Sequence, residues 1–305
     1  MDSSTASGVR SAVLAYSMWG GFTAYWKILS GFAAAELIGW RVGSAAAVLW
    51  LLVAARSRLQ NVGTAVSSPE VRRHLLGASA LLIVNWSTYV AAVTSGRVIE
   101  TALGYFLAPL ITMGLGVWLL DEHLTRVRSM AIVLVAVAIV ILSVSYGRLP
   151  WIAVLLGGSW ALYGLVKRRV ALDPIESLTG EVTLLAPIAA TVIVISLVRS
   201  GGAGDIAQGA DWLLLAGTGA VTAAPLLLFA HAAPRVPFTL LGPIGWLVPV
   251  INLALGWVVY GEDMPGIRLI GFAMVWVALV AVAAEAIRDR QARQRIERRE
   301  AGALQ

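Results

Sequence analysis

The sequence predicts an all-α integral membrane protein with ten transmembrane helices, arranged as two inverted five-helix repeats. Three observations predict this fold: an apolar composition, ten apolar stretches, and a match of the chain to itself. Hydrophobic residues make up 59% of the 305 residues, charged residues make up 13%, and the mean hydropathy is +0.81. A soluble chain needs more polar side chains than this to cover its surface. Soluble enzymes, disordered chains, collagens and secreted disulfide scaffolds are therefore excluded.

Ten apolar stretches have the length that a membrane-spanning helix needs. A hydrocarbon core of about 30 Å is crossed by about 20 residues that rise 1.5 Å each. Charge clusters and turn residues divide the chain into such segments, and short connectors join them. The predicted segments are 11–30, 36–55, 75–94, 101–120, 128–146, 149–166, 178–198, 212–232, 238–260 and 266–286.

The distribution of Lys and Arg predicts the orientation of these segments. Cytoplasmic loops hold an excess of Lys and Arg. If both termini are cytoplasmic, 17 of the 23 basic residues lie on that side and four on the other, namely Arg97, Arg148, Arg199 and Arg268. This ratio predicts an even number of spans. The basic tail, 287–305, is predicted to be solvated or to lie on anionic lipid. It lacks the aromatic and groove-reading elements of a nucleic-acid-binding segment.

The segment 106–142 matches the segment 246–282 without a gap, with eleven of 37 positions identical. Four of the matches involve residues that are rare in apolar segments: Pro109 with Pro249, Gly116 with Gly256, Glu122 with Glu262, and Arg128 with Arg268. The match predicts a first repeat over 1–146 and a second over 147–286. Because each repeat has an odd number of helices, the second enters the membrane from the opposite face.

Inverted repeats are typical of secondary transporters, which bind substrate near the membrane midplane between the halves. Pro109 and Pro249 occupy equivalent places inside spans, where a proline breaks a helical hydrogen bond. Asn85 lies near mid-span with a side chain too short to reach the interface, so it needs a partner or a cavity. Aromatic side chains either line an amphipathic pocket or pack in the core. The predicted substrate cavity is lined by Asn85, Trp86, Pro109, Pro249, Tyr105 and Trp19.

Four charged residues are predicted at one depth near the outer face: Lys27, Glu36, Arg41 and Glu100. Charges inside a span are costly, and pairing offsets part of the cost. The four residues are therefore predicted to form an outer gate or ion-pair set, with Glu100 pairing with Lys27 or Arg41. The alternative is that each side chain snorkels to the interface alone. Whether Glu100 or Glu181 carries protons is left open.

The run VNWSTYVAAVTSGRVIETALGYFLAPLITMGLGVWLLDEHL, residues 84–124, resembles the RarD proteins, which are drug/metabolite transporters of the EamA type. YWKI, LYGLVKRR, PLLLF and YGED extend the resemblance along nearly the whole chain. It implies ten helices in two halves, cytoplasmic termini, a bacterial inner membrane, and export or exchange of small metabolites or drugs. The chain departs from the family at LLDEH, where Gly-Glu is usual.

Motifs for enzymatic chemistry are missing from the sequence. The three histidines are far apart, and no nucleophile elbow, P-loop or EF-hand pattern occurs. No catalytic residue, metal site or cofactor is predicted, and the chain has no cysteine. The expected partners are a small-molecule substrate and membrane lipid, with no nucleic acid. The protein is expected to be a monomer unless Gly39 and Gly43 serve self-association rather than internal packing. The alternative function is a duplicated membrane scaffold or a membrane-embedded enzyme without transport activity.

Overall fold

The computed structural model describes residues 3–120, 125–167, 172–232, 235–236 and 244–303, and these residues form an all-helical protein. Glu122, which is part of the predicted repeat match, lies outside the described residues. The helices are α1 (Ser3–Ile28), α2 (Ala34–Ala55), α3 (Leu59–Ser67), α4 (Pro69–Thr94), α5 (Val98–Leu120), α6 (Arg126–Tyr146), α7 (Trp151–Lys167), α8 (Pro174–Val198), α9 (Ala203–Ile206), α10 (Ala210–Ala232), α12 (Leu247–Ala254), the π-helix η1 (Leu255–Val259) and α13 (Gly266–Ala303).

Each of the ten predicted segments overlaps one of these helices. Seven helices are long and apolar enough to cross a membrane: α2, α4, α5, α6, α8, α10 and α13. Two shorter apolar helices, α7 and α12 with η1, and the 26-residue α1 cover the remaining segments. The protein is thus a multi-pass helical membrane protein.

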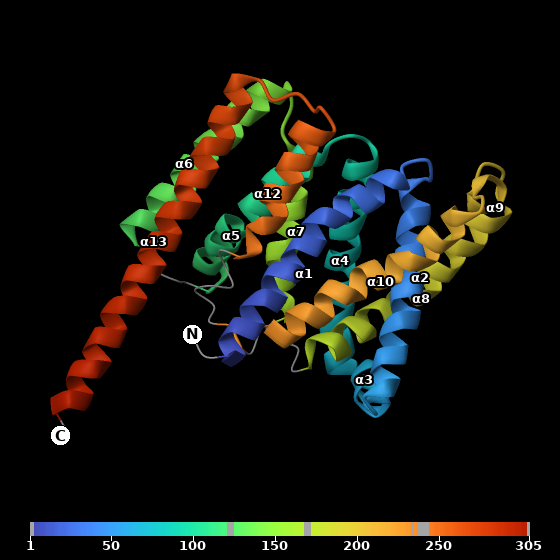
Figure 1. Cartoon of the computed structure of the whole chain (residues 1–305), viewed down its shortest axis with the longest axis horizontal. Coiled ribbons are helices and arrows are strands. Elements are labelled where there is room, and N and C mark those ends of the chain that lie inside the picture. Colours follow the sequence, from blue (N-terminus) through green and yellow to red (C-terminus); the bar gives the residue numbers. More distant parts are fainter. Residues whose placement is uncertain (1–2, 121–124, 168–171, 233–234, 237–243, 304–305) are drawn as a thin grey trace.

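Eight of the described helices form a closed ring in which each packs on the next: α1, α10, α2, α8, α4, α7, α5, α12 and back to α1. The pair α6 and α13 stands outside this ring and packs against α5 (Figure 1). The N-terminal end of α1 and the C-terminal end of α13 lie at the lower end in Figure 1. We call this end the termini side and the opposite end the far side.

Glycines allow the close helix crossings within the ring. Gly104 of α5 and Gly157 of α7 face each other, and a Cβ atom built on Gly157 would lie 2.9 Å from the Gly104 carbonyl oxygen. Gly39 and Gly43 of α2 contact Val192 and Ile193 of α8. These two glycines therefore serve packing within the chain, which is one of the two uses considered for them.

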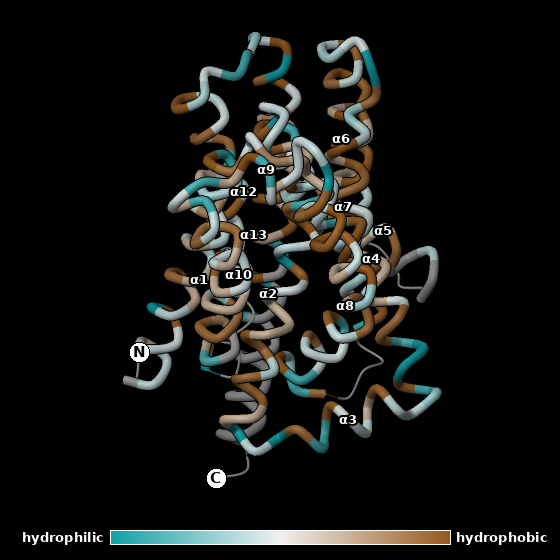
Figure 2. Tube along the Cα trace, turned by 90° about the vertical axis from the view of Figure 1, so that its right-hand side faces the viewer, coloured by the Kyte–Doolittle hydropathy of each residue, from teal (hydrophilic) through white to brown (hydrophobic). Residues whose placement is uncertain are grey.

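Hydrophobic residues predominate along the helices, and hydrophilic residues gather mainly at helix ends and connections (Figure 2). The exposed apolar residues of α6 recur every three or four positions, as on one face of a helix. They are Met130, Val133, Val137, Val140 and Val144. Such a face is suited to contact with lipid tails.

The structure differs from the predicted elements mainly at the segment ends. Helix α1 begins at Ser3 instead of residue 11, and α13 continues as one helix to Ala303 through the predicted tail. The short helices α3 and α9 were not predicted. Both are too short to span a membrane, so the search for long apolar stretches does not detect them.

Candidate functional site

A chain of buried hydrogen bonds joins four helices in the far-side half of the ring, and we call its members Thr23, Tyr89, Thr101 and Asn252 the polar centre. Thr23 Oγ1 donates to Asn252 Oδ1 at 2.6 Å and lies 2.6 Å from the Tyr89 hydroxyl. Because Thr23 has one hydroxyl proton, Tyr89 is the donor to Thr23. Asn252 Nδ2 continues the chain to Thr101 Oγ1 at 3.4 Å. The polar centre connects α1, α4, α5 and α12.

The guanidinium of Arg41, on α2, lies over two tryptophan rings beside the polar centre. Its Cζ atom is 3.9 Å from the Trp86 ring centroid and 5.0 Å from that of Trp26. Tyr89 and Tyr105 lie near Arg41, and their rings pack edge to face at 5.9 Å. Trp26 and Trp86 are buried, whereas Arg41 and Tyr105 keep part of their surface. We call Trp26, Arg41 and Trp86 the arginine cage.

Of the predicted cavity residues, Trp86 and Tyr105 lie at this site. Asn85 instead donates to the Leu156 carbonyl oxygen at 3.1 Å and to Ser159 Oγ at 3.0 Å, which joins α4 to α7. Consecutive residues on a helix point about 100° apart, so Asn85 and Trp86 face different neighbours.

The other predicted wall residues lie apart from the arginine cage. Trp19 packs with Tyr16 and Phe229 in an aromatic cluster between α1 and α10. Pro109 is inside α5 and exposed, and Pro249 lies buried in the first turn of α12.

The predicted pairing of Glu100 with Lys27 or Arg41 is wrong. Glu100 is paired with Arg97, at 3.1 Å, and with Arg148. Because α5 packs on α7, the segment that precedes α7 brings Arg148 to the first turn of α5. Lys27 contacts the Val93 carbonyl oxygen at 3.5 Å and the Tyr260 ring at 5.6 Å.

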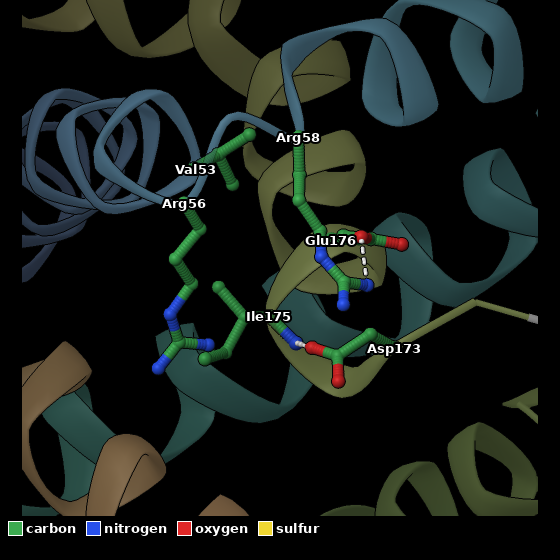
Figure 3. A pocket seen from close by; sticks show the side chains of 6 residues that line it. All are labelled: Val53, Arg56, Arg58, Asp173, Ile175 and Glu176. Atoms are coloured by element: carbon green, nitrogen blue, oxygen red, sulfur yellow. Dashed lines mark hydrogen bonds and ion pairs between the residues drawn. The ribbon is translucent and has the colours of Figure 1, made fainter.

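Two ion pairs close the α2–α8 interface at its opposite ends. Glu36, in the first turn of α2, pairs with Arg199 just after α8 at 3.1 Å. Glu176, in the first turn of α8, pairs with Arg58 just after α2 at 3.0 Å. The second pair borders a pocket of about 330 Å³ on the termini side, with Arg58 over Glu176 (Figure 3). Glu36 thus has a partner, although the partner is neither Lys27 nor Arg41.

Glu181 is completely buried and fully partnered on the termini side. Its carboxylate accepts from Lys167 Nζ at 2.6 Å, from the Tyr163 hydroxyl at 2.9 Å and from Ser177 Oγ at 3.0 Å. Lys167 and Glu181 therefore form a neutral pair within the protein.

Sequence reasoning missed Trp26, Thr23 and Thr101 as members of the site. The signal that finds them is helical spacing: Thr23 and Trp26 are three residues apart on α1, and Thr101 and Tyr105 are four apart on α5. Residues at these spacings share one face of a helix.

Comparisons with known proteins fit this architecture. Residues 6–144 match the EamA-like transporter family. Protein RarD of Streptomyces exfoliatus is 37% identical over 93% of this chain and 90% of its own. The uncharacterized transporter YojE of Bacillus subtilis is 34% identical over 90% of this chain and 93% of its own. One crystal structure, 20% identical, covers 92% of this chain and 98% of its own with a TM-score of 0.60, a likeness of fold alone. This multi-pass membrane protein belongs to the EamA-like transporter family, among its RarD-like members.

Proposed function

We propose that this protein is a secondary transporter that moves small metabolites or drugs across a bacterial inner membrane by alternating access. The two repeats, 1–146 and 147–286, would exchange conformations to give inward-open and outward-open states of similar energy. The observation that carries the proposal is the order of helices around the ring.

The ring keeps its order when the two halves are exchanged. The offset of 140 residues makes α1, α2, α4 and α5 the counterparts of α7, α8, α10 and α12. Replacing each ring helix by its counterpart turns the sequence α1–α10–α2–α8–α4–α7–α5–α12 into the same ring, read from α7. The outer pair, α6 and α13, are also counterparts. This pattern supports an inverted repeat of five helices in each half.

The ion pairs of the α2–α8 interface support the same symmetry. Glu36 and Glu176 are 140 residues apart, and their partners Arg199 and Arg58 follow the ends of counterpart helices. An inverted repeat places such equivalent contacts on opposite sides of the membrane. Together with the excess of Lys and Arg, this supports cytoplasmic termini and an external position for the Glu36–Arg199 pair.

The test is flux through the purified protein in liposomes loaded with amino acids, drugs and related metabolites, followed by mass spectrometry. Ser44 Oγ of α2 lies 2.8 Å from Thr218 Oγ1 of α10, so cysteines at both positions would bridge the two proposed halves. The chain has no other cysteine. We expect the oxidised S44C/T218C variant to lose flux and a reductant to restore it.

If every compound leaves the protein-containing liposomes no faster than it leaves protein-free liposomes, transport is rejected. That result would favour a duplicated membrane scaffold or an embedded enzyme. Equal flux in the oxidised and reduced states would reject relative movement of the halves at this contact, and the alternating-access mechanism proposed here with it.

A further inference from the structure

Arg41 is a cation inside the helical ring without an acidic partner among the described residues. It forms no ion pair and no hydrogen bond with any of them, and its Nε atom is buried without a hydrogen-bond partner. It lies seven residues into α2, roughly 10 Å from the start of that helix. An unpaired charge at such a place is costly, and charges of this kind in membrane proteins mark binding sites and ion pathways.

The arginine cage stabilises the cation without using its hydrogen-bonding groups. Trp86 and Trp26 contact the guanidinium through their ring faces, and such contacts are favourable for a desolvated cation. The N–H groups of a guanidinium lie in its plane and point away from a stacked ring. A carboxylate binds Arg in that plane, through two parallel hydrogen bonds. Stacking therefore leaves the carboxylate-binding edge free.

The offset of 140 residues gives an internal comparison for this charge. Lys27 corresponds to Lys167, and Arg41 corresponds to Glu181. In the second repeat, Lys167 and Glu181 neutralise each other at 2.6 Å. In the first repeat both positions are cationic, and neither cation has a carboxylate within 4 Å among the described residues. The first repeat thus lacks the negative charge that the second supplies from its own sequence.

We propose that Arg41 binds the carboxylate of a small organic monoanion, and that this monoanion is the substrate of the transporter. This inference rests on the transport function proposed above. The carbon skeleton would lie against Trp86 and Tyr105, whose hydroxyl hydrogen-bonds to no described residue. One carboxylate cancels the single charge of Arg41, so the loaded site is neutral when it crosses the low-dielectric interior. A dianion such as phosphate would leave a net charge there.

The test uses benzoate and its neutral isostere benzamide as probes of the purified wild-type protein in detergent. Equilibrium dialysis with labelled probe measures affinity, and the thermal unfolding midpoint provides a second readout. We expect saturable benzoate binding and no benzamide binding. R41Q is expected to weaken benzoate binding roughly 10- to 100-fold, as for loss of hydrogen bonds to a charged group. R41K, which keeps the charge but not the two-pronged geometry, should fall between R41Q and wild type.

R148Q is the matched control, because it removes one arginine from the same side while Glu100 keeps Arg97 as a partner. R148Q should bind benzoate as the wild type does. If R41Q fails to fold, protection of Arg41 from phenylglyoxal by benzoate, and not by benzamide, replaces the variant.

Three results would overturn the inference: equal binding of benzoate and benzamide, no binding of benzoate, or wild-type affinity in R41Q. The liposome assay separates these results from failure of the transport proposal. Flux of uncharged compounds with no benzoate binding would reject the carboxylate site and leave transport standing. No flux of any compound would reject transport itself.

Discussion

Glu36 and Glu176 hold one helix interface from its two ends. Each lies in the first turn of its helix, α2 or α8, and each reaches an arginine just beyond the end of the other helix. Both glutamates are buried, whereas Arg58 and Arg199 are more than half exposed. The buried glutamates therefore need these ion pairs more than the exposed arginines do, because water can solvate an exposed guanidinium.

This asymmetry predicts that R199Q destabilises the protein more than E36Q. R199Q leaves a buried carboxylate unpaired, which costs about 1–3 kcal/mol, whereas E36Q leaves an exposed arginine, which costs roughly 0–1 kcal/mol. In the second pair, R58Q should likewise destabilise the protein more than E176Q. Unfolding in detergent measures the difference, with R56Q as the control, because Arg56 forms no ion pair among the described residues. Equal losses in E36Q and R199Q would contradict the prediction.

The proposed orientation predicts the labelling of single cysteines in intact cells. Gln60 on α3 and Ser200 after α8 are exposed and lie on opposite sides of the molecule. A membrane-impermeant maleimide should label S200C in intact cells and Q60C only after permeabilisation. Both termini should behave like Q60C. The reverse pattern would overturn the orientation.

Asn85 is predicted to stabilise the contact between α4 and α7. N85A removes two buried hydrogen bonds, to the Leu156 carbonyl and to Ser159, so we expect a loss of about 1–3 kcal/mol in the free energy of unfolding. The variant S159A, which keeps the bond to Leu156, should lose less. If N85A unfolded like the wild type but lost flux, Asn85 would belong to the substrate path instead.

Glu100 should be coupled to Arg148 and not to Lys27. The buried carboxylate of Glu100 is paired with Arg148, whereas Lys27 lies on a carbonyl oxygen and an aromatic ring. A double-mutant cycle of E100Q and R148Q should give a coupling of about 0.5–3 kcal/mol in unfolding. The matched cycle of E100Q and K27M should be additive within about 0.5 kcal/mol. Coupling in the second cycle would restore Lys27 as a partner of Glu100.

The positions of the helices can be predicted from the sequence, but which helices pack against one another cannot. A continuous apolar run of about 20 residues specifies a spanning helix, and the depth of each charge follows from its distance to the helix end. Helix neighbours are harder to predict, because segments that are apolar all round carry little periodicity to show which face is inside. The predicted partner of Glu100 is therefore wrong, because Glu100 pairs with Arg97 and Arg148. For the same reason, Trp86 was placed at the site while its neighbour Asn85 faces α7.

Glu262, in the connection between η1 and α13, caps the first turn of α5. Its carboxylate accepts from the Val98 N–H at 2.6 Å and from the Ile99 N–H at 2.8 Å. Burial raises the pKa of Glu262 above its ordinary value, although these two bonds act in the opposite direction. The folded protein then holds a proton at Glu262 more tightly than the unfolded chain does.

This difference sets the sign of the pH effect. Between the unfolded pKa, about 4.3, and the higher folded pKa, the folded state binds more protons, so the free energy of unfolding falls as the pH rises. Unfolding of the wild type, measured from pH 4 to 8, should show this fall. E262Q should lose it and should also lose about 1 kcal/mol at neutral pH, because an amide oxygen replaces only one of two acceptors. D263N, which changes the exposed neighbouring acid, should keep the wild-type slope. An unchanged slope in E262Q would show that other groups cause the fall.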